Sequence, residues 1–196
     1  MMTSIGSGTV NRRLAIGAAG AVAAGWALPG QLRARVVTQR GMIGGGALQL
    51  EQGQVDFSVF ASRLTFDEGN DIILGSIRWV DAGGGVTLAS TRITEYDVLE
   101  SGEGELRQIR GTMSANGEGE HPFIMDVLDL GAPGAGVDTV TLNVGASAVA
   151  AGATPTADTT GFGYTATGAL AAGDLQDVDI SGDIDAGEVV PATPES

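Results

Sequence analysis

The sequence predicts an all-β protein, an antiparallel β-sandwich or β-barrel of about 8–10 strands, preceded by an N-terminal signal segment. Three observations support this fold class. From Gly44 onward, apolar and polar residues alternate with a period of two. Glycine-rich breaks interrupt this alternation at regular intervals. After residue 34 the sequence has no amphipathic helical pattern of convincing length.

The alternating runs locate the strands in order. In the first run, Val55, Phe57 and Val59 alternate with polar residues, as in a strand with one buried face. Phe60 lies on the opposite face, where we expect a second layer to cover it; the alternative is an exposed patch for a glycan or a partner. Runs at 55–61, 72–79, 86–98, 123–128 and 140–144 are separated by turns at 67–70, 83–85, 101–104, 116–119 and 131–136.

The first 34 residues have the layout of a secretory signal peptide. Arg12-Arg13 precedes the uncharged stretch Leu14–Leu28, and cleavage after Ala27 or Ala34 fits the small residues there. The paired arginines resemble a twin-arginine signal, which predicts a secreted or cell-surface protein. The alternative is an uncleaved segment that anchors the chain, and this would be its only contact with a membrane.

The remaining chain predicts one domain with a loop and a tail. We expect a single β-domain over residues 35–186. The alanine-rich segment near 145–160 predicts a long exposed loop rather than a helix. Residues 187–196 contain two prolines and no apolar periodicity, which predicts a disordered tail.

Composition excludes several classes of function. The chain has no Cys, which excludes disulfides and thiolate chemistry, and a single His, which excludes a zinc site of the His/Cys type. Acidic residues outnumber basic ones 24 to 10, for a net charge of -14. All the basic residues are Arg. A chain this acidic is a poor ligand for nucleic acid, so we expect no nucleic-acid partner.

An ordered series of short motifs spans residues 41–180. They are Gly44–Gly46, Val55–Phe60, Gly75–Asp81, Ser90–Thr94, Gly111–Gly117, Asp129, Pro133-Gly134, Gly168–Leu170 and Gly173–Gln176. In this order and spacing, the chain resembles the post-COAP type of secreted bacterial β-domain. The resemblance implies an antiparallel β-fold outside the cytoplasmic membrane and implies no reaction. The segment 145–160 departs from the family pattern as an insertion.

The C-terminal acidic segment is a candidate calcium loop. Oxygen-bearing side chains stand at positions 1, 3, 5, 9 and 12 of the loop pattern, with Gly182 at position 6 and the aliphatic Ile184 at position 8. The candidate ligands are Asp177, Asp179, Ser181, Asp183, Asp185 and Glu188. No helix can follow Glu188, so we favour a last strand, Leu175–Ile184, with its acids in solvent.

Two other polar features have simpler interpretations. Asp67–Asp71 predicts a hairpin turn rather than a cation site, because Gly69-Asn70 suits positive φ. His121 beside Glu118 and Glu120 predicts a solvated loop histidine rather than a general base.

The predicted function is that of an exported, non-enzymatic β-module with a structural or interaction role at or outside the cell surface. Its partner would be an unidentified protein or glycan. No nucleophile elbow or phosphate loop occurs in the sequence, so no catalytic residue or organic cofactor is predicted. The alternatives are a calcium-binding extracellular module that uses residues 177–188, and a secreted carbohydrate-active protein.

Overall fold

The computed structural model describes residues 36–181 except 68, 102–103, 129–137 and 160. The predicted signal segment and tail lie outside this part of the chain. The described part contains nine strands and one short helix: β1 Val36–Leu50, β2 Gly53–Phe66, β3 Asp71–Asp81, β4 Val86–Ser101, β5 Gly104–Ala115, β6 Glu118–Leu128, β7 Thr139–Gly145, α1 Ala146–Ala150, β8 Gly163–Asp177 and β9 Ile180–Ser181. The prediction of an all-β fold is confirmed.

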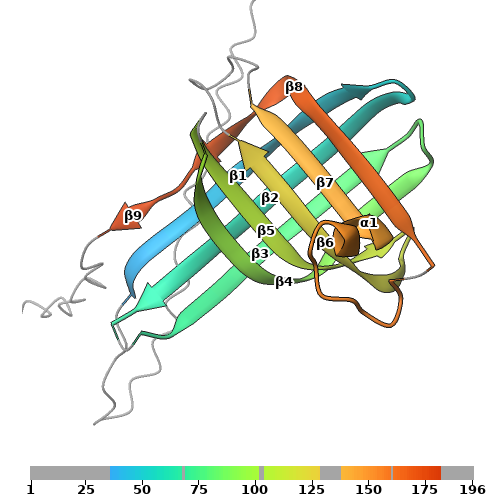
Figure 1. Cartoon of the computed structure of the whole chain (residues 1–196). Coiled ribbons are helices and arrows are strands. Elements are labelled where there is room, and N and C mark those ends of the chain that lie inside the picture. The colour runs from blue at the N-terminus through green and yellow to red at the C-terminus, as the bar shows by residue number, and fades with distance from the viewer. Residues whose placement is uncertain (1–35, 68, 102–103, 129–137, 160, 182–196) are drawn as a thin grey trace, which may run out of the picture. The chain divides into compact units, whose positions relative to one another are not determined.

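The strands form an antiparallel barrel rather than a sandwich. Strands β1 to β8 pair with their neighbours in chain order, and β1 pairs with both β2 and β8, which closes the sheet. The two-residue strand β9 pairs with β1 below the end of β8. Figure 1 shows the strands inclined around a common axis. Of the two predicted architectures, the barrel is therefore correct and the sandwich is wrong.

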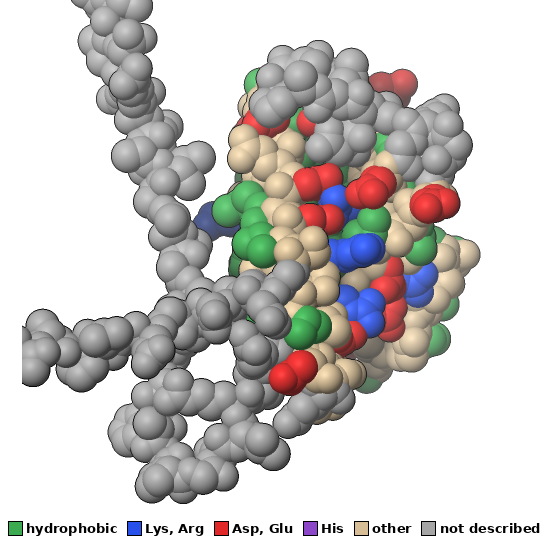
Figure 2. Space-filling view, turned by 90° about the vertical axis from the view of Figure 1, so that its left-hand side faces the viewer, with side chains coloured by type: hydrophobic (Ala, Val, Ile, Leu, Met, Phe, Trp, Pro, Cys, Tyr) green, Lys and Arg blue, Asp and Glu red, His purple; other side chains and the backbone are tan. Residues whose placement is uncertain are grey.

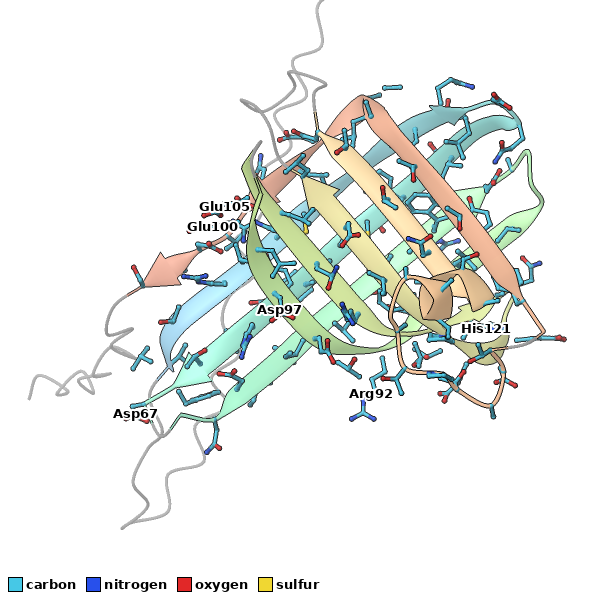
Figure 3. All side chains as sticks on the ribbon, in the orientation of Figure 1. Asp67, Arg92, Asp97, Glu100, Glu105 and His121 are labelled. Atoms are coloured by element: carbon cyan, nitrogen blue, oxygen red, sulfur yellow. The ribbon has the colours of Figure 1, made fainter. Side chains whose placement is uncertain are left out.

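The barrel interior is filled by the apolar side chains of the alternating runs. Strand β2 contributes Val55, Phe57 and Val59, as the period-two pattern predicts. Trp79 packs on Phe57, with 5.4 Å between ring centroids. An eight-stranded barrel has an interior just wide enough for side chains to fill it. We call the end with the β1–β2 and β3–β4 hairpins the upper end, and the opposite end, near Asp67 and Glu105, the lower end; in Figures 1 and 3 the upper end lies at the right and the lower end at the left.

Closure depends on glycines in the middle of β1. A Cβ on Gly46 would lie 2.1 Å from the carbonyl oxygen of Ala172, and one on Gly44 would lie 2.2 Å from that of Asp174. Both oxygens belong to β8, so β8 can approach β1 this closely only because these positions lack side chains. The Gly44–Gly46 run, which opens the family-like motif series, therefore lies inside a strand where the barrel closes.

The segment after β7 begins with the five-residue helix α1, where a loop was predicted, and its described remainder up to β8 is non-helical, as predicted. Ala148 on α1 and Ala153 after it are buried against Ile124, on the outer surface of β6. The helix begins directly after Gly145, which has a φ of 64°. Small side chains let this segment lie flat on the barrel wall, so tertiary packing supports a helix too short to be stable alone.

Strand β4 bends away from β3 because it contains two bulges. Its register with β5 shifts between Ser90 and Arg92 and again between Ile93 and Glu95, so Thr91 and Thr94 are extra residues. Both extra residues contact β5 through their hydroxyls: Thr91 Oγ1 lies 2.8 Å from Thr112 Oγ1, and Thr94 Oγ1 donates to the Arg110 carbonyl at 3.3 Å. Bulges bend the strand that carries them. Figure 1 shows β4 curving upward while β3 continues straight to the lower left.

We predict that Gly46→Ala lowers the free energy of unfolding by about 3 kcal/mol, because the new methyl group meets β8 backbone that cannot move aside independently. Chemical denaturation measures this change. Gly168→Ala is the matched control, since its Cβ would have 3.7 Å to the nearest atoms; its effect should stay below about 1 kcal/mol. Equal effects of the two substitutions would contradict the assigned closure.

Candidate functional site

A buried arginine occupies the lower end of the barrel. The Arg107 side chain on β5 is only 2% exposed. Its guanidinium donates to the Tyr96 hydroxyl at 2.9 Å, to Asp177 at 2.5 Å, to Glu105 at 3.0 Å and to Asp179 at 3.3 Å. We call these five residues the Arg107 cluster. They connect the neighbouring strands β4 and β5 to the end of β8, which pairs with neither of them.

The cluster compensates the cost of burying a charge. Burial lowers the pKa of Arg107, but hydrogen bonds to Tyr96 and Asp179 and the charge of Asp177 outweigh it, so the pKa ends above its ordinary value. Arg107 Nε is buried without a hydrogen-bond partner in the described part of the chain. The three carboxylates remain one-third exposed or more, so solvent shares in their stabilisation.

The candidate calcium ligands divide into three groups. Asp177 and Asp179 direct their carboxylates to Arg107, and Asp179 also accepts a hydrogen bond from the Gly41 amide at 3.0 Å. Ser181 lies on β9 opposite Thr38. Asp183, Asp185 and Glu188 lie outside the described residues. Within the described ranges, no three His, Asp or Glu side chains converge in a way that could hold a metal ion.

Arg107 is not among the site residues that the sequence pattern indicated. The sequence does contain an indication that Arg107 points inward. It is two residues from Ile109, and in a regular strand residues two apart lie on the same face. Its acidic partners could not be inferred, since Asp177 follows 70 residues later in the chain. Burial of Arg107 depends on barrel closure, which brings the end of β8 back to the interior.

A second network of hydrogen bonds lies at the upper end of the barrel. The Trp79 indole N–H donates to the Tyr164 hydroxyl at 2.9 Å, and that hydroxyl donates to Asp81 at 3.0 Å. Asp81 also accepts the Gly84 amide at 2.7 Å. Burial raises the pKa of Asp81, but the bonds from Gly84 and Tyr164 outweigh it and leave that pKa below its ordinary value. Ionised Asp81 therefore anchors the β3–β4 hairpin.

The two other polar predictions have different outcomes. The chain does turn at 67–70, where Gly69 has a φ of 79°, and Asp71 then forms an ion pair with Arg63. His121, predicted as a solvated loop residue, is instead buried on β6. Its Nδ1 lies 3.1 Å from the Asp158 carbonyl, and its ring packs on Phe162 with 5.0 Å between centroids. The segment after α1 therefore covers His121, which the local sequence could not reveal.

Large apolar side chains are exposed on the outer surface of the lower end. Ile43, Phe60, Ile72 and Leu74, on β1, β2 and β3, are each between 40% and 48% exposed. The register places them on one outward face: Ile43 lies opposite Phe60, and Leu74 lies opposite Ser62, two residues further along β2. We call these four residues the outer apolar face. The expectation that a second layer covers Phe60 is therefore wrong, and the exposed-patch alternative describes its position.

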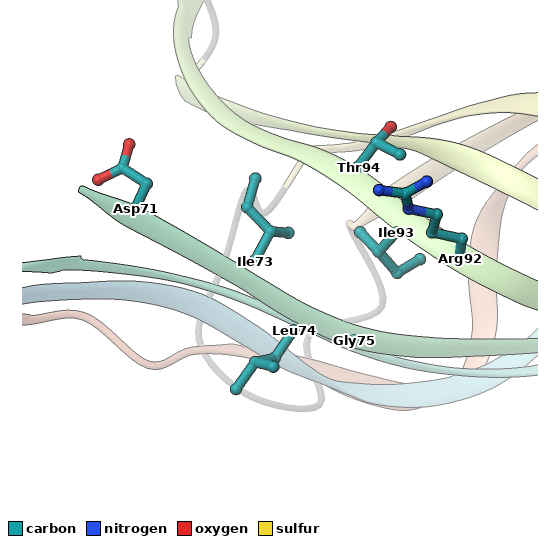
Figure 4. Close-up of a pocket in the computed structure, with 7 residues that line it drawn as sticks. All are labelled: Asp71, Ile73, Leu74, Gly75, Arg92, Ile93 and Thr94. Carbon is teal, nitrogen blue, oxygen red and sulfur yellow. The ribbon is translucent and has the colours of Figure 1, made fainter.

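Beside this face, a groove separates β3 from β4. Its volume is about 660 Å³. Figure 4 shows Ile73 of β3 and Ile93 of β4 directed into the gap, while Leu74 points to the other side of the sheet. We call this space the β3/β4 groove. It is lined by Asp71, Ile73, Leu74, Gly75, Arg92, Ile93 and Thr94.

Charges of both signs surround the lower end. Arg63 lies between β1 and β3 and pairs with Asp71 and with Asp97 of β4, at 3.2 Å in the second case. Figure 2, which views the molecule from the left side of Figure 1, shows basic side chains among acidic ones on this face. Arg92, labelled in Figure 3, projects away from the barrel and forms no ion pair with the described residues.

Comparison with models of protein families, with curated proteins and with solved structures finds no match. No helix among the described residues is long and apolar enough to cross a membrane.

We predict that neither tyrosine ionises near pH 10. Burial is the main cause that raises the pKa of Tyr96 and of Tyr164 to about 12. These are the protein's only two tyrosines, so absorbance at 295 nm during a pH titration reports them directly. Tyr96→Phe and Tyr164→Phe should each remove half of the signal.

The same shifts predict alkaline destabilisation. Each tyrosine has a folded-state pKa above the unfolded value of about 10. Its contribution to the free energy of unfolding is therefore fully present below pH 10 and is lost as pH rises towards 12. Ionisation of either tyrosine near pH 10 in folded protein would contradict its burial.

We predict that millimolar calcium leaves the melting temperature unchanged relative to EDTA, because Asp177 and Asp179 are already bound by Arg107. A ligand that binds only the folded state would raise this temperature. A calcium-dependent rise that disappears in Asp177→Asn, but persists in Asp174→Asn, would contradict this prediction and support the calcium loop.

Proposed function

We propose that the protein is an exported, non-enzymatic β-module that binds a partner through the outer apolar face. The observation that carries this proposal is the clustering of Ile43, Phe60, Ile72 and Leu74 on one exposed surface. Exposed apolar patches rimmed by polar residues are typical of interaction sites. The aromatic ring of Phe60 suits either a protein surface or a glycan ring, and the continuous apolar neighbours favour a protein.

The β3/β4 groove is the place to consider the carbohydrate-active alternative, since apolar side chains fill most of the barrel interior. Glycoside hydrolysis requires two carboxylates at the reacting bond. Among the residues that line the β3/β4 groove, Asp71 is the one carboxylate, and it is paired with Arg63. The carbohydrate-active alternative therefore finds no support at this groove.

Export rests on the sequence. The layout of residues 1–34 and the resemblance to secreted post-COAP type β-domains support it. A net charge of -14 favours solubility in a compartment where the protein would meet its partner. Calcium binding by residues 177–188 is the alternative role, and it requires Asp177 and Asp179 to leave Arg107.

Photocrosslinking tests the proposed surface. We predict that p-benzoylphenylalanine at position 60, in the exported full chain, gives a discrete crosslinked product with a partner macromolecule. The substituted ring should not perturb folding, because Phe60 is already 41% exposed. Melting temperature checks this.

The matched control places the same probe at Asp56, an exposed outward position on the same strand. We expect no product there. A further probe is placed at Leu74, on the same outer apolar face. Absence of a crosslinked product from the probes at both Phe60 and Leu74 would overturn the proposed function. A product of twice the protein's mass would identify a second copy as the partner of the outer apolar face.

A further inference from the structure

The ladder between β3 and β4 ends before the strands do. Pairing extends only from Arg78–Asp81 to Val86–Ala89, whereas β3 pairs with β2 all the way to Asp71. Within the described residues, the 71–77 half of β3 therefore has a strand neighbour on one side only. An edge with free N–H and C=O groups is a template for a further strand.

The direction of the free groups follows from one hydrogen bond. The Ile77 amide donates to Ser90 Oγ at 2.9 Å, so Ile77 faces β4. Alternate residues of an antiparallel strand present their backbone groups to the same side. Ile73 and Gly75 therefore direct N–H and C=O groups into the β3/β4 groove, where β4 is too far away to pair with them.

The lining of the groove suits an extended chain with apolar side chains. Ile73 and Ile93 are directed into it (Figure 4). A Cβ on Gly75 would lie 2.9 Å from Ile93 Cγ1, so the bare backbone of Gly75 is what lets Ile93 sit there. The volume of about 660 Å³ falls in the range of ligand-binding pockets, roughly 300–1,000 Å³.

Two observations restrict the occupant. Strands β3 and β4 line the groove from opposite sides, so a single strand can enter, whereas a folded second copy would bring its own neighbouring strands. Asp71 is neutralised by Arg63, and Arg92 has no ion pair among the described residues. The groove therefore has one uncompensated positive charge in an acidic protein, which favours an acidic residue in the occupant.

We infer that the β3/β4 groove binds an extended peptide segment of a partner protein by strand addition to β3. The peptide alternates apolar residues with polar ones and places a carboxylate at Arg92. Backbone hydrogen bonds to Ile73 and Gly75 supply affinity, and the contacts at Ile93 and Arg92 supply specificity. This inference rests on the proposed function and names its partner class.

Selection from a displayed library of random twelve-residue peptides against the full chain tests the inference. Selected peptides should share alternating apolar residues with an Asp or Glu. Their affinity should fall at least tenfold in Arg92→Glu. Arg78→Glu is the matched control, because Arg78 lies on β3 outside the groove lining, and it should leave affinity within about twofold.

Ile73→Pro tests strand addition separately from charge. Proline at position 73 removes an N–H group that faces the groove and forms no hydrogen bond with β2. The fold should therefore tolerate this substitution, because edge strands accept proline where the N–H does not face a neighbouring strand. Melting temperature verifies this. We expect Ile73→Pro to abolish peptide binding and Ile73→Val to retain it. Binding that persists in a folded Ile73→Pro protein would overturn strand addition.

The remaining outcomes separate the two proposals. Failure to select any peptide that is sensitive to Arg92→Glu, while crosslinking from Phe60 still succeeds, overturns the groove inference alone. Failure of both overturns the proposed function. Displacement of selected peptides by a synthetic peptide of residues 182–196 would assign the groove to the chain's own C-terminal segment, which also overturns a partner in trans.

Discussion

The two bulges in β4 are the constraint on which the rest of the lower end depends. A closed barrel needs two neighbours for every strand, and β4 cannot follow β3 to its end because Thr91 and Thr94 bend it towards β5. Their hydroxyl contacts with β5 keep the bend in place. The barrel therefore closes fully in its upper half and only partly below, which creates both the free edge of β3 and the space beside it.

The Arg107 cluster is the second feature that shapes the lower end of the barrel. A guanidinium inside a barrel is expensive unless charged partners reach it. Asp177 and Asp179 reach Arg107 because β8 continues past β7 along β1 and then turns at Val178, whose amide donates to the Gly41 carbonyl at 2.8 Å. The cluster thus fixes the end of β8 to β5, and it uses two acids whose sequence pattern alone indicates a calcium loop.

The alternating runs in the sequence located β2, β3, β4, β6 and β7, but they located neither β1 nor β5 and did not reveal barrel closure. Alternation of Val55, Phe57 and Val59 reports which face of one strand is buried, and the structure confirms it. Nothing in that pattern distinguishes a barrel from a sandwich, because closure is decided by the pairing of β1 with β8, far apart in the chain. The run Gly44–Gly46 becomes informative only when β8 lies against it.

One of the β4 bulges beside the β3/β4 groove is visible in the sequence. Ile93 and Tyr96 are both buried although they are three residues apart. A regular strand would direct them to opposite faces, whereas a bulge between them allows both to point inward.

The outer apolar face was predicted only in part. The alternation placed Phe60 and Phe57 on opposite faces of the same strand, but the sequence could not tell whether a second layer covers Phe60. His121 shows the same limit, since the segment that buries it, which includes the Asp158 carbonyl, follows 37 residues later in the chain.

Amide hydrogen exchange of the full chain, followed by NMR, tests the central claim that the lower half of β3 is an unpaired edge. Ile73, Gly75 and Trp79 lie on one strand and present their amides to the same side, but only Trp79 has β4 as a partner. We expect Ile73 and Gly75 to exchange at least about a hundredfold faster than Trp79. Protection of Ile73 and Gly75 equal to that of Trp79 would show that the ladder continues, and would contradict the account.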